Sequence, residues 1–158
     1  LLIGKICFNF RHLKCAFFNI MEIKTIYLSK YDWTVTIFYD YICKYFEDVM
    51  EELEYIECGE ESLKRAYKNL TTCGYNNGLT FSNHLAHKSV IVIGRTSSAK
   101  EFEKTWSHES GHLADHICLT YDISPHGEEI QYLGDYIIDK TWDSAKKYLC
   151  DCCRIKKR

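Results

Sequence analysis

The chain has 158 residues, of which 46% are hydrophobic and 27% charged, a composition that is typical of a folded protein and excludes a disordered one. Its formal net charge is −2, so no global electrostatic field attracts nucleic acid or an anionic membrane surface. The length is sufficient for one domain with a substantial hydrophobic core.

Residues 1–20, LLIGKICFNFRHLKCAFFNI, are apolar enough to resemble a targeting segment, but Arg11 and Lys14 interrupt the apolar run. A membrane span needs about 20 consecutive apolar residues, and a signal peptide needs an unbroken apolar region followed by small residues. We therefore expect a single domain over residues 21–158, with residues 1–20 an upstream extension of the reading frame. A genuine N-terminal strand or anchor is the alternative.

The first half of the domain combines runs of β-forming residues with apolar residues at helical spacing. A turn-forming CGYNNG stretch separates its helices from a later pair of strands, which we expect to form an antiparallel hairpin. The predicted elements are strands at 22–29 and 33–41, helices at 43–57 (ended by Gly59) and 61–71, and strands at 79–84 and 89–94.

A long helix is predicted to begin at Ser98, because Ser98 and Glu101 fit a capping box. Its buried stripe is predicted to contain Phe102, Trp106, Leu113, Ile117 and Tyr121. Pro125, directly after Ser124, is predicted to occupy the first position of the next helix, which then continues over residues 126–139. A separate final helix is predicted over 141–149.

The long helix carries the pattern H-E-x-x-H at His108-Glu109-Ser110-Gly111-His112. Residues four apart lie on one helical face about 5–6 Å from each other, so two imidazoles can converge on one zinc ion. The glutamate between them can take a proton from a zinc-bound water, whose pKa the metal lowers toward about 7. Gly111 is unfavourable inside a helix, and a close approach of another segment would account for it. The alternative is an ordinary solvated helix face.

A catalytic zinc ion usually has three protein ligands, and four acidic or imidazole side chains are candidates for the third. His116 lies roughly 12 Å along the helix from His108, which favours a role beside the metal ligands or on the surface. Asp115 is a candidate to orient a ligand imidazole. Glu128 and Glu129, on the following helix, are therefore the main candidates, and periodicity does not choose between them.

The segments SHESGHLADHI and YDISPHGEEIQYLGDYI resemble the gluzincin class of zinc metallopeptidases, in which a later helix supplies a glutamate ligand. More narrowly, they resemble small H-E-x-x-H proteins of gut Bacteroidales and their phages, as do AYKNLTT, NNGLTFSN, VIVIGRTSS and LCDCCR. The resemblance implies zinc as cofactor, and similarity to phage-immunity-type peptidases favours Glu129 over Glu128 as ligand. By the same analogy, the strand at 89–97 would bind substrate as an added strand. His126, Tyr132 and Tyr136 are possible transition-state stabilisers, with structural roles as the alternative.

The nine cysteines are odd in number and scattered along the chain, which favours free thiols in a reducing cytoplasm over a disulfide framework. Cys150, Cys152 and Cys153 form the other cluster that could hold a metal, although no second paired set of ligands accompanies them. Plain free thiols are the preferred interpretation of this cluster. The basic residues that follow it are expected to be solvated.

Taken together, these patterns predict an α+β protein in which a small antiparallel or mixed sheet packs on helices. The predicted function is a cytoplasmic zinc-dependent hydrolase of minimal gluzincin type that acts on a peptide or protein, with Glu109 as general base and His108, His112 and Glu129 as ligands. A non-hydrolytic zinc-stabilised regulatory or binding module of phage or host origin is the alternative. Regulated proteolysis of one protein partner is a third possibility.

Overall fold

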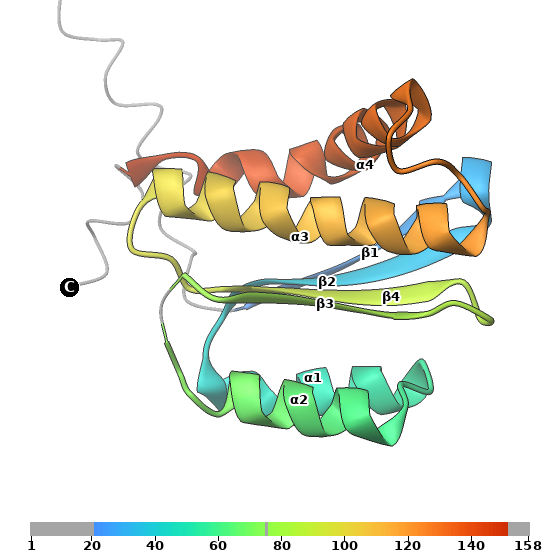
Figure 1. Ribbon diagram of the computed structural model, residues 1–158. Coiled ribbons are helices and arrows are strands. Elements are labelled where there is room, and N and C mark those ends of the chain that lie inside the picture. The colour runs from blue at the N-terminus through green and yellow to red at the C-terminus, as the bar shows by residue number, and fades with distance from the viewer. Residues whose placement is uncertain (1–20, 75, 152–158) are drawn as a thin grey trace, which may run out of the picture.

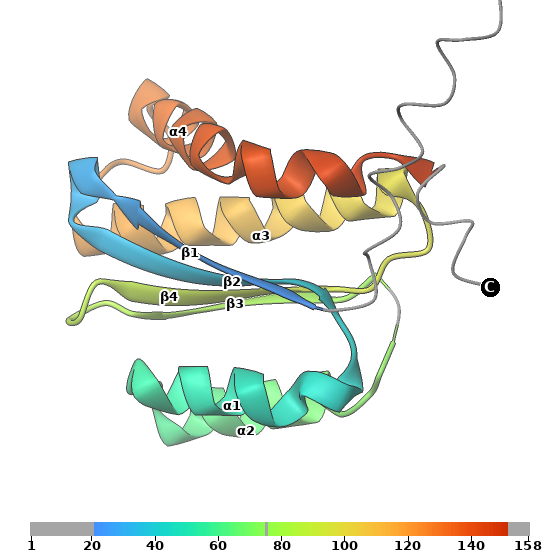
Figure 2. The same cartoon turned by 180° about the vertical axis from the view of Figure 1, so that it is seen from behind.

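The computed structural model describes residues 21–74 and 76–151 and has three layers, with a sheet between two pairs of helices (Figure 1). α1 and α2 cover one face of the sheet, and α3 and α4 cover the other; the reverse view shows the same layers (Figure 2). The strands are β1 (Glu22–Leu28), β2 (Trp33–Tyr41), β3 (Gly78–Asn83) and β4 (Lys88–Gly94). The α-helices are α1 (Phe46–Tyr55), α2 (Glu60–Leu70), α3 (Ala99–Thr120) and α4 (Glu128–Ala145), and short 3-10 turns lie at Ser29–Tyr31, Cys43–Tyr45 and Lys146–Tyr148. The expected α+β class with a small mixed sheet is confirmed.

The strand order is β1-β2-β4-β3. β3 and β4 form the predicted antiparallel hairpin, β1 and β2 form a second one, and β2 joins β4 in parallel. β4 is therefore hydrogen-bonded on both sides and has no edge to which a peptide could add. The expectation that the strand at 89–97 binds substrate by strand addition is wrong, because sequence shows that this segment is a strand but not that it lies in the interior of the sheet.

The two central strands are buried on both faces, which explains their nearly continuous apolar sequences. Val35 and Ile37 of β2 alternate with Phe38, so that one set faces α3 and α4 and the other faces α1 and α2. β4 behaves in the same way, with Ile91 on the α3 side and Val92 on the other. Each helix pair therefore closes its own apolar core, and α3 is held rigidly against the sheet.

α3 starts after Ser98 as predicted, but only half of the expected capping box forms, since the Glu101 carboxylate does not bond back to the Ser98 backbone. The Ser98 side chain accepts a hydrogen bond from the backbone N–H of Glu101 at 3.1 Å. The Glu101 carboxylate pairs with Lys104 at 3.4 Å. Four members of the predicted stripe are buried, whereas Tyr121 caps the helix and is 39% exposed.

The last helix differs from the prediction at both ends. α4 begins at Glu128 behind Gly127, and Pro125 lies in the preceding turn instead of opening the helix. α4 then continues without a break to Ala145, so the separate helix predicted over 141–149 does not exist. Within this helix the buried Thr141 hydroxyl donates to the carbonyl oxygen of Ile137 at 2.9 Å, so its polar group is satisfied.

A disulfide joins Cys43 and Cys73, whose Cα atoms are 5.4 Å apart, so the expectation of free thiols is wrong for this pair. The two residues are 30 positions apart in sequence. They meet because Cys43, just before α1, and Cys73, just after α2, lie at the same end of the sheet. Cys58 and Cys118 are free, as expected. In the part of the chain that the structure describes, no helix has the length and apolarity needed to cross a membrane.

Candidate active site

α3 packs against α4 on one face and against β3 on another. Of the H-E-x-x-H residues, Glu109 lies on the β3 face, whereas His108 and His112 are exposed to solvent. The face toward α4 contains Trp106, whose ring N–H donates to Thr141 at 3.1 Å. The face toward β3 contains Glu109 and His116, each of which is hydrogen-bonded to that strand. Successive residues turn by about 100°, so His108 and His112 lie at the exposed margin beside the β3 face and away from α4.

His108 and His112 form a close pair at this margin. Their Nε2 atoms are 3.1 Å apart, so that one ring can donate a hydrogen bond to the other, and their ring centroids are 4.5 Å apart. Two imidazoles bound to one tetrahedral zinc ion have nitrogens about 3.3 Å apart, because each Zn–N bond is about 2.0–2.1 Å. The pair therefore has the spacing of two ligands of one ion, and both rings are open to solvent.

Glu109 is directed inward, although it lies between two exposed histidines in sequence. It is only 4% exposed, and its carboxylate accepts a hydrogen bond from the Thr80 hydroxyl at 2.8 Å. Burial raises the pKa of Glu109, while the Thr80 hydrogen bond and the charges of His112 and His108 act in the opposite direction. A carboxyl group whose pKa is shifted toward neutrality and that lies beside the imidazole pair suits general base chemistry.

β3 supplies a wall for Glu109 that the sequence analysis did not identify. Gly78, Thr80 and Ser82 alternate along the strand and face α3, whereas Leu79 belongs to the core on the opposite face. A Cβ atom at Gly78 would lie 2.4 Å from Oε1 of Glu109, so a side chain at this position would displace the carboxylate from its observed place. The alternation of small polar and apolar residues in GLTFSN was the signal that could have revealed this wall.

His116 belongs to the wall and is separate from the exposed pair. Its Nδ1 lies 2.8 Å from the Ser82 hydroxyl, and its ring centroid is 6.5 Å from that of His112. Burial lowers the pKa of His116, as do His84 and His112, while Asp115 acts in the opposite direction. His116 is therefore a neutral packing residue near neutral pH, which agrees with its expected place outside the ligand set.

Asp115 is exposed, and within the described chain it makes no hydrogen bond to His112. Its charge acts instead on two neighbours. It opposes the lowering of the His116 pKa by burial, and, together with the charge of Glu129, it raises the pKa of the Cys118 thiol, for which burial is the larger cause. The structure therefore does not show Asp115 in the expected role, which was to orient the imidazole of a metal-binding histidine.

Glu128 and Glu129 form the first turn of α4, as predicted, but the structure does not bring either of them to the histidine pair. Glu129 acts electrostatically on Cys118, which lies on the α4 side of α3. Over residues 21–74 and 76–151, no three His, Cys, Asp or Glu side chains form a group that could hold a metal ion. The pair thus offers two side chains that could bind a metal, and the assignments of His108, His112 and Glu129 as ligands remain predictions.

The three possible transition-state stabilisers are also placed away from the pair. His126 lies in the turn before α4 and not on the helix, and its backbone N–H donates to the Ser124 hydroxyl. The Tyr132 hydroxyl lies 3.5 Å from Glu128, and that of Tyr136 lies 3.4 Å from Ser29, beyond the end of β1.

A hollow opens beside His108 and Glu109, between the first half of α3 and the connection that leads into β3. Its other lining residues are polar or small, namely Asn76, Asn77, Gly78, Glu101, Lys104 and Thr105. Glu109 therefore borders a hollow that is open to solvent, although the residue itself is only 4% exposed.

Of the second candidate metal cluster, the structure describes Cys150, and Cys152 and Cys153 lie outside the described residues. Cys150 lies after the last 3-10 turn and is disulfide-bonded, so the expectation of free thiols is wrong for this residue as well. A metal at this cluster stays a prediction.

Comparisons of the chain with protein-family models, with curated proteins and with solved structures found no match.

Proposed function

We propose that this chain is a zinc-dependent hydrolase in which His108 and His112 hold the metal and Glu109 is the general base. The observation that carries the proposal is the 3.1 Å separation of the two Nε2 atoms, with a buried carboxylate on the same helix beside them. A bound zinc ion supplies a water of lowered pKa and polarises a carbonyl group. Glu109 accepts a proton at its carboxylate and returns it to the leaving group, while Thr80 holds that carboxylate in place.

The proposed substrate is an extended peptide segment. β3 pairs only with β4 among the described strands, so its outer edge offers backbone groups for strand addition next to Glu109. This edge replaces the strand at 89–97 as the expected binding element. The polar hollow beside His108 would receive the part of the peptide that extends past the start of β3.

A role for zinc in catalysis is favoured over a role in folding. A structural zinc ion stabilises a fold by joining separate segments of the chain. His108 and His112 lie on successive turns of one helix and are exposed, so an ion held by them would join no two elements. This argument supports the hydrolase over the zinc-stabilised binding module.

The third ligand is part of the proposal that the structure leaves open. Two side-chain ligands are one fewer than catalytic zinc sites usually have. The gluzincin resemblance assigns the third position to Glu129, and Glu128 is the alternative. Zinc titration of Glu129→Gln and Glu128→Gln tests the assignment, which requires that only Glu129→Gln weakens binding.

The test of function uses Glu109→Gln, because an amide has no carboxylate to accept the proton but has nearly the same shape. We expect this variant to bind zinc as wild type does and to lose hydrolysis of a peptide library. Glu103→Gln is the matched control, since Glu103 is exposed on the same helix. A wild-type protein that cleaves no peptide but binds a partner tightly would favour the binding module instead.

A further inference from the structure

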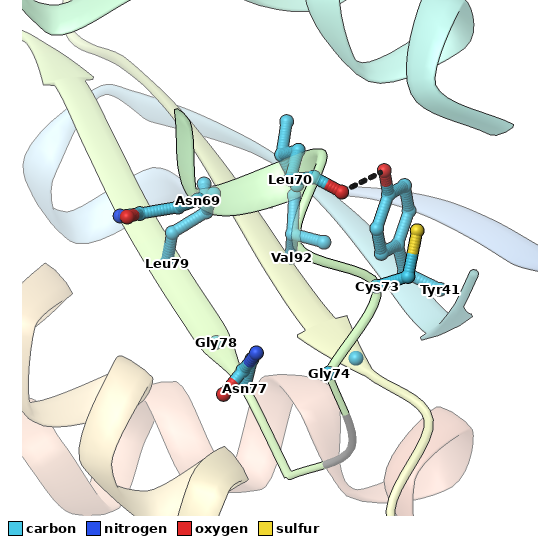
Figure 3. Close-up of a pocket in the computed structure, with 10 residues that line it drawn as sticks. Tyr41, Asn69, Leu70, Cys73, Gly74, Asn77, Gly78, Leu79 and Val92 are labelled. Carbon is cyan, nitrogen blue, oxygen red and sulfur yellow. Dashed lines mark hydrogen bonds between the residues drawn. The ribbon is translucent and has the colours of Figure 1, made fainter. Parts of the chain in front are cut away.

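The Cys43–Cys73 disulfide lies at the start of the connection that leads to the wall of the candidate site. Cys73 follows α2, and Gly78 opens β3 only five residues later. Figure 3 shows Cys73 and Gly74 on this path, with Asn77 and Gly78 beyond them at the start of the strand. Cys43, at the other end of the bond, is anchored directly after β2.

On its other side, the connection is held by hydrogen bonds to the end of β4. The backbone N–H of Gly94 donates to the carbonyl oxygen of Asn77 at 2.7 Å, and that of Asn76 donates to the carbonyl oxygen of Arg95 at 2.9 Å. Cys73 and Asn76 both have left-handed backbone conformations, with φ angles of 52° and 63°. Because such angles are unfavourable for residues with a side chain, this path needs external ties, and the disulfide is the covalent one.

The disulfide is open to small molecules in solution. Cys73 is exposed, and both cysteines line a hollow of about 120 Å³ together with Tyr41, Ile42, Gly74 and Arg95. The Arg95 guanidinium, which also lines this hollow, is paired with Asp40 at 2.8 Å. A thiolate is the form that attacks and leaves in disulfide exchange, so the exposed Cys73 sulfur is the one that a thiolate in solution can reach.

We infer that Cys43 and Cys73 form a reversible thiol-exchange site, whose reductant is a small thiol or dithiol, and that its state controls how firmly the start of β3 is held. A thiolate from the reductant attacks the exposed Cys73 sulfur, the bond between Cys73 and Cys43 breaks, and Cys43 leaves as a thiolate that takes up a proton. A second thiol then attacks the mixed disulfide, which releases Cys73 as a thiol and the reductant as its disulfide. The reductant is oxidised by two electrons, and the protein gains two protons and two electrons.

The consequence for the site follows from the position of Gly78. Its backbone forms the surface against which the Glu109 carboxylate packs, and Asn76 and Asn77 line the hollow beside His108. Release of Cys73 loosens these residues and thereby the wall that positions Glu109. This regulatory step rests on the proposed function, whereas thiol exchange and loosening of the strand do not.

The experiment uses the full chain without metal, either air-oxidised or treated with dithiothreitol or reduced glutathione. Alkylation followed by peptide mass analysis counts free thiols, and hydrogen exchange follows the backbone amides. We expect reduction without denaturant to expose Cys43 and Cys73 to alkylation and to speed exchange at residues 76–80 by about tenfold or more, while β1 changes less than about twofold. Reduction should also lower the melting temperature by roughly 5–15 °C.

Variants make the result independent of the reductant. Cys43→Ser and Cys73→Ser should each show the fast exchange at residues 76–80 under oxidising conditions, whereas Cys58→Ser, which removes a free thiol, should behave as wild type. The inference is overturned if the oxidised protein already alkylates at both cysteines, if exchange at residues 76–80 does not respond, or if β1 responds equally. Because the protein carries no metal here, failure of this test is separate from failure of zinc binding by His108 and His112.

Discussion

Substitution of Gly78 by alanine tests whether β3 positions Glu109. The added Cβ would lie 2.4 Å from Oε1 and 2.7 Å from Cγ of Glu109, about 1 Å closer than ordinary contact allows. The carboxylate is buried and hydrogen-bonded to Thr80 at 2.8 Å, and we expect its displacement to weaken or break this bond. Loss of a hydrogen bond to a charged group costs about 1.5–3 kcal/mol, and relaxation and the better strand propensity of alanine offset part of it.

We therefore expect Gly78→Ala to lower the free energy of unfolding by about 1–3 kcal/mol in urea titrations of the metal-free protein. The matched control is Gly111→Ala on the exposed side of α3, where a Cβ would meet nothing within 4 Å. That open space also means that no close approach explains Gly111, contrary to expectation. The control should gain about 1 kcal/mol from helix propensity. The account of the wall fails if Gly78→Ala is as stable as wild type.

Three further outcomes are expected. Thr80→Val should lower the free energy of unfolding by about 1–3 kcal/mol, because it leaves the Glu109 carboxylate without its hydrogen-bond donor. Thr80→Ser keeps a hydroxyl and should retain most of the wild-type stability. Equal stability of the two variants would contradict this role of Thr80. Since burial raises the pKa of Glu109, the folded protein holds this proton more tightly than the unfolded chain, and the associated stability is lost as pH rises from about 4.5 through the folded pKa. Glu109→Gln should flatten that decline in urea titrations between pH 4 and 8, and an unchanged slope would count against it. Gly134→Ala, in open space within α4, should raise the melting temperature by roughly 2–4 °C, and a fall would show a contact that the structure lacks.

Local patterns in the sequence predicted most of the elements. Alternating apolar residues and helical spacing depend on a few neighbouring residues, so the four strands and the start of α3 at Ser98 could be found in this way. The continuous course of α4 was missed because the polar Thr141 occupies a buried position of the helix, where it continues the line of Leu133 and Ile137 and its hydroxyl donates to the carbonyl oxygen of Ile137. Strand order was equally hidden, since nothing local in SVIVIG shows that β4 pairs with β2 as well as with β3.

The candidate site was predicted to the same limited extent. Spacing of four residues on a helix is enough to bring His108 and His112 together, and the structure has them at contact distance. Which side of α3 the next helix covers depends on packing between distant segments. α4 packs on the side of Trp106 and Cys118, so the position of Glu129 relative to the pair could not be derived from the sequence. The same limit applies to the Gly78 wall and to the Cys43–Cys73 bond.

The most direct test of the central claim is a zinc titration of the metal-free protein against a competing chelator, with wild type compared to His108→Ala and His112→Ala. The account predicts about one zinc ion per wild-type chain. Each substitution removes a proposed zinc ligand. It should therefore weaken zinc binding by more than the roughly 10–100-fold loss that follows when a residue hydrogen-bonded to a ligand is removed. His126→Ala, in the turn before α4, is the matched control and should bind as wild type does. Equal zinc affinity of wild type and His112→Ala would contradict the claim that this pair is a metal site.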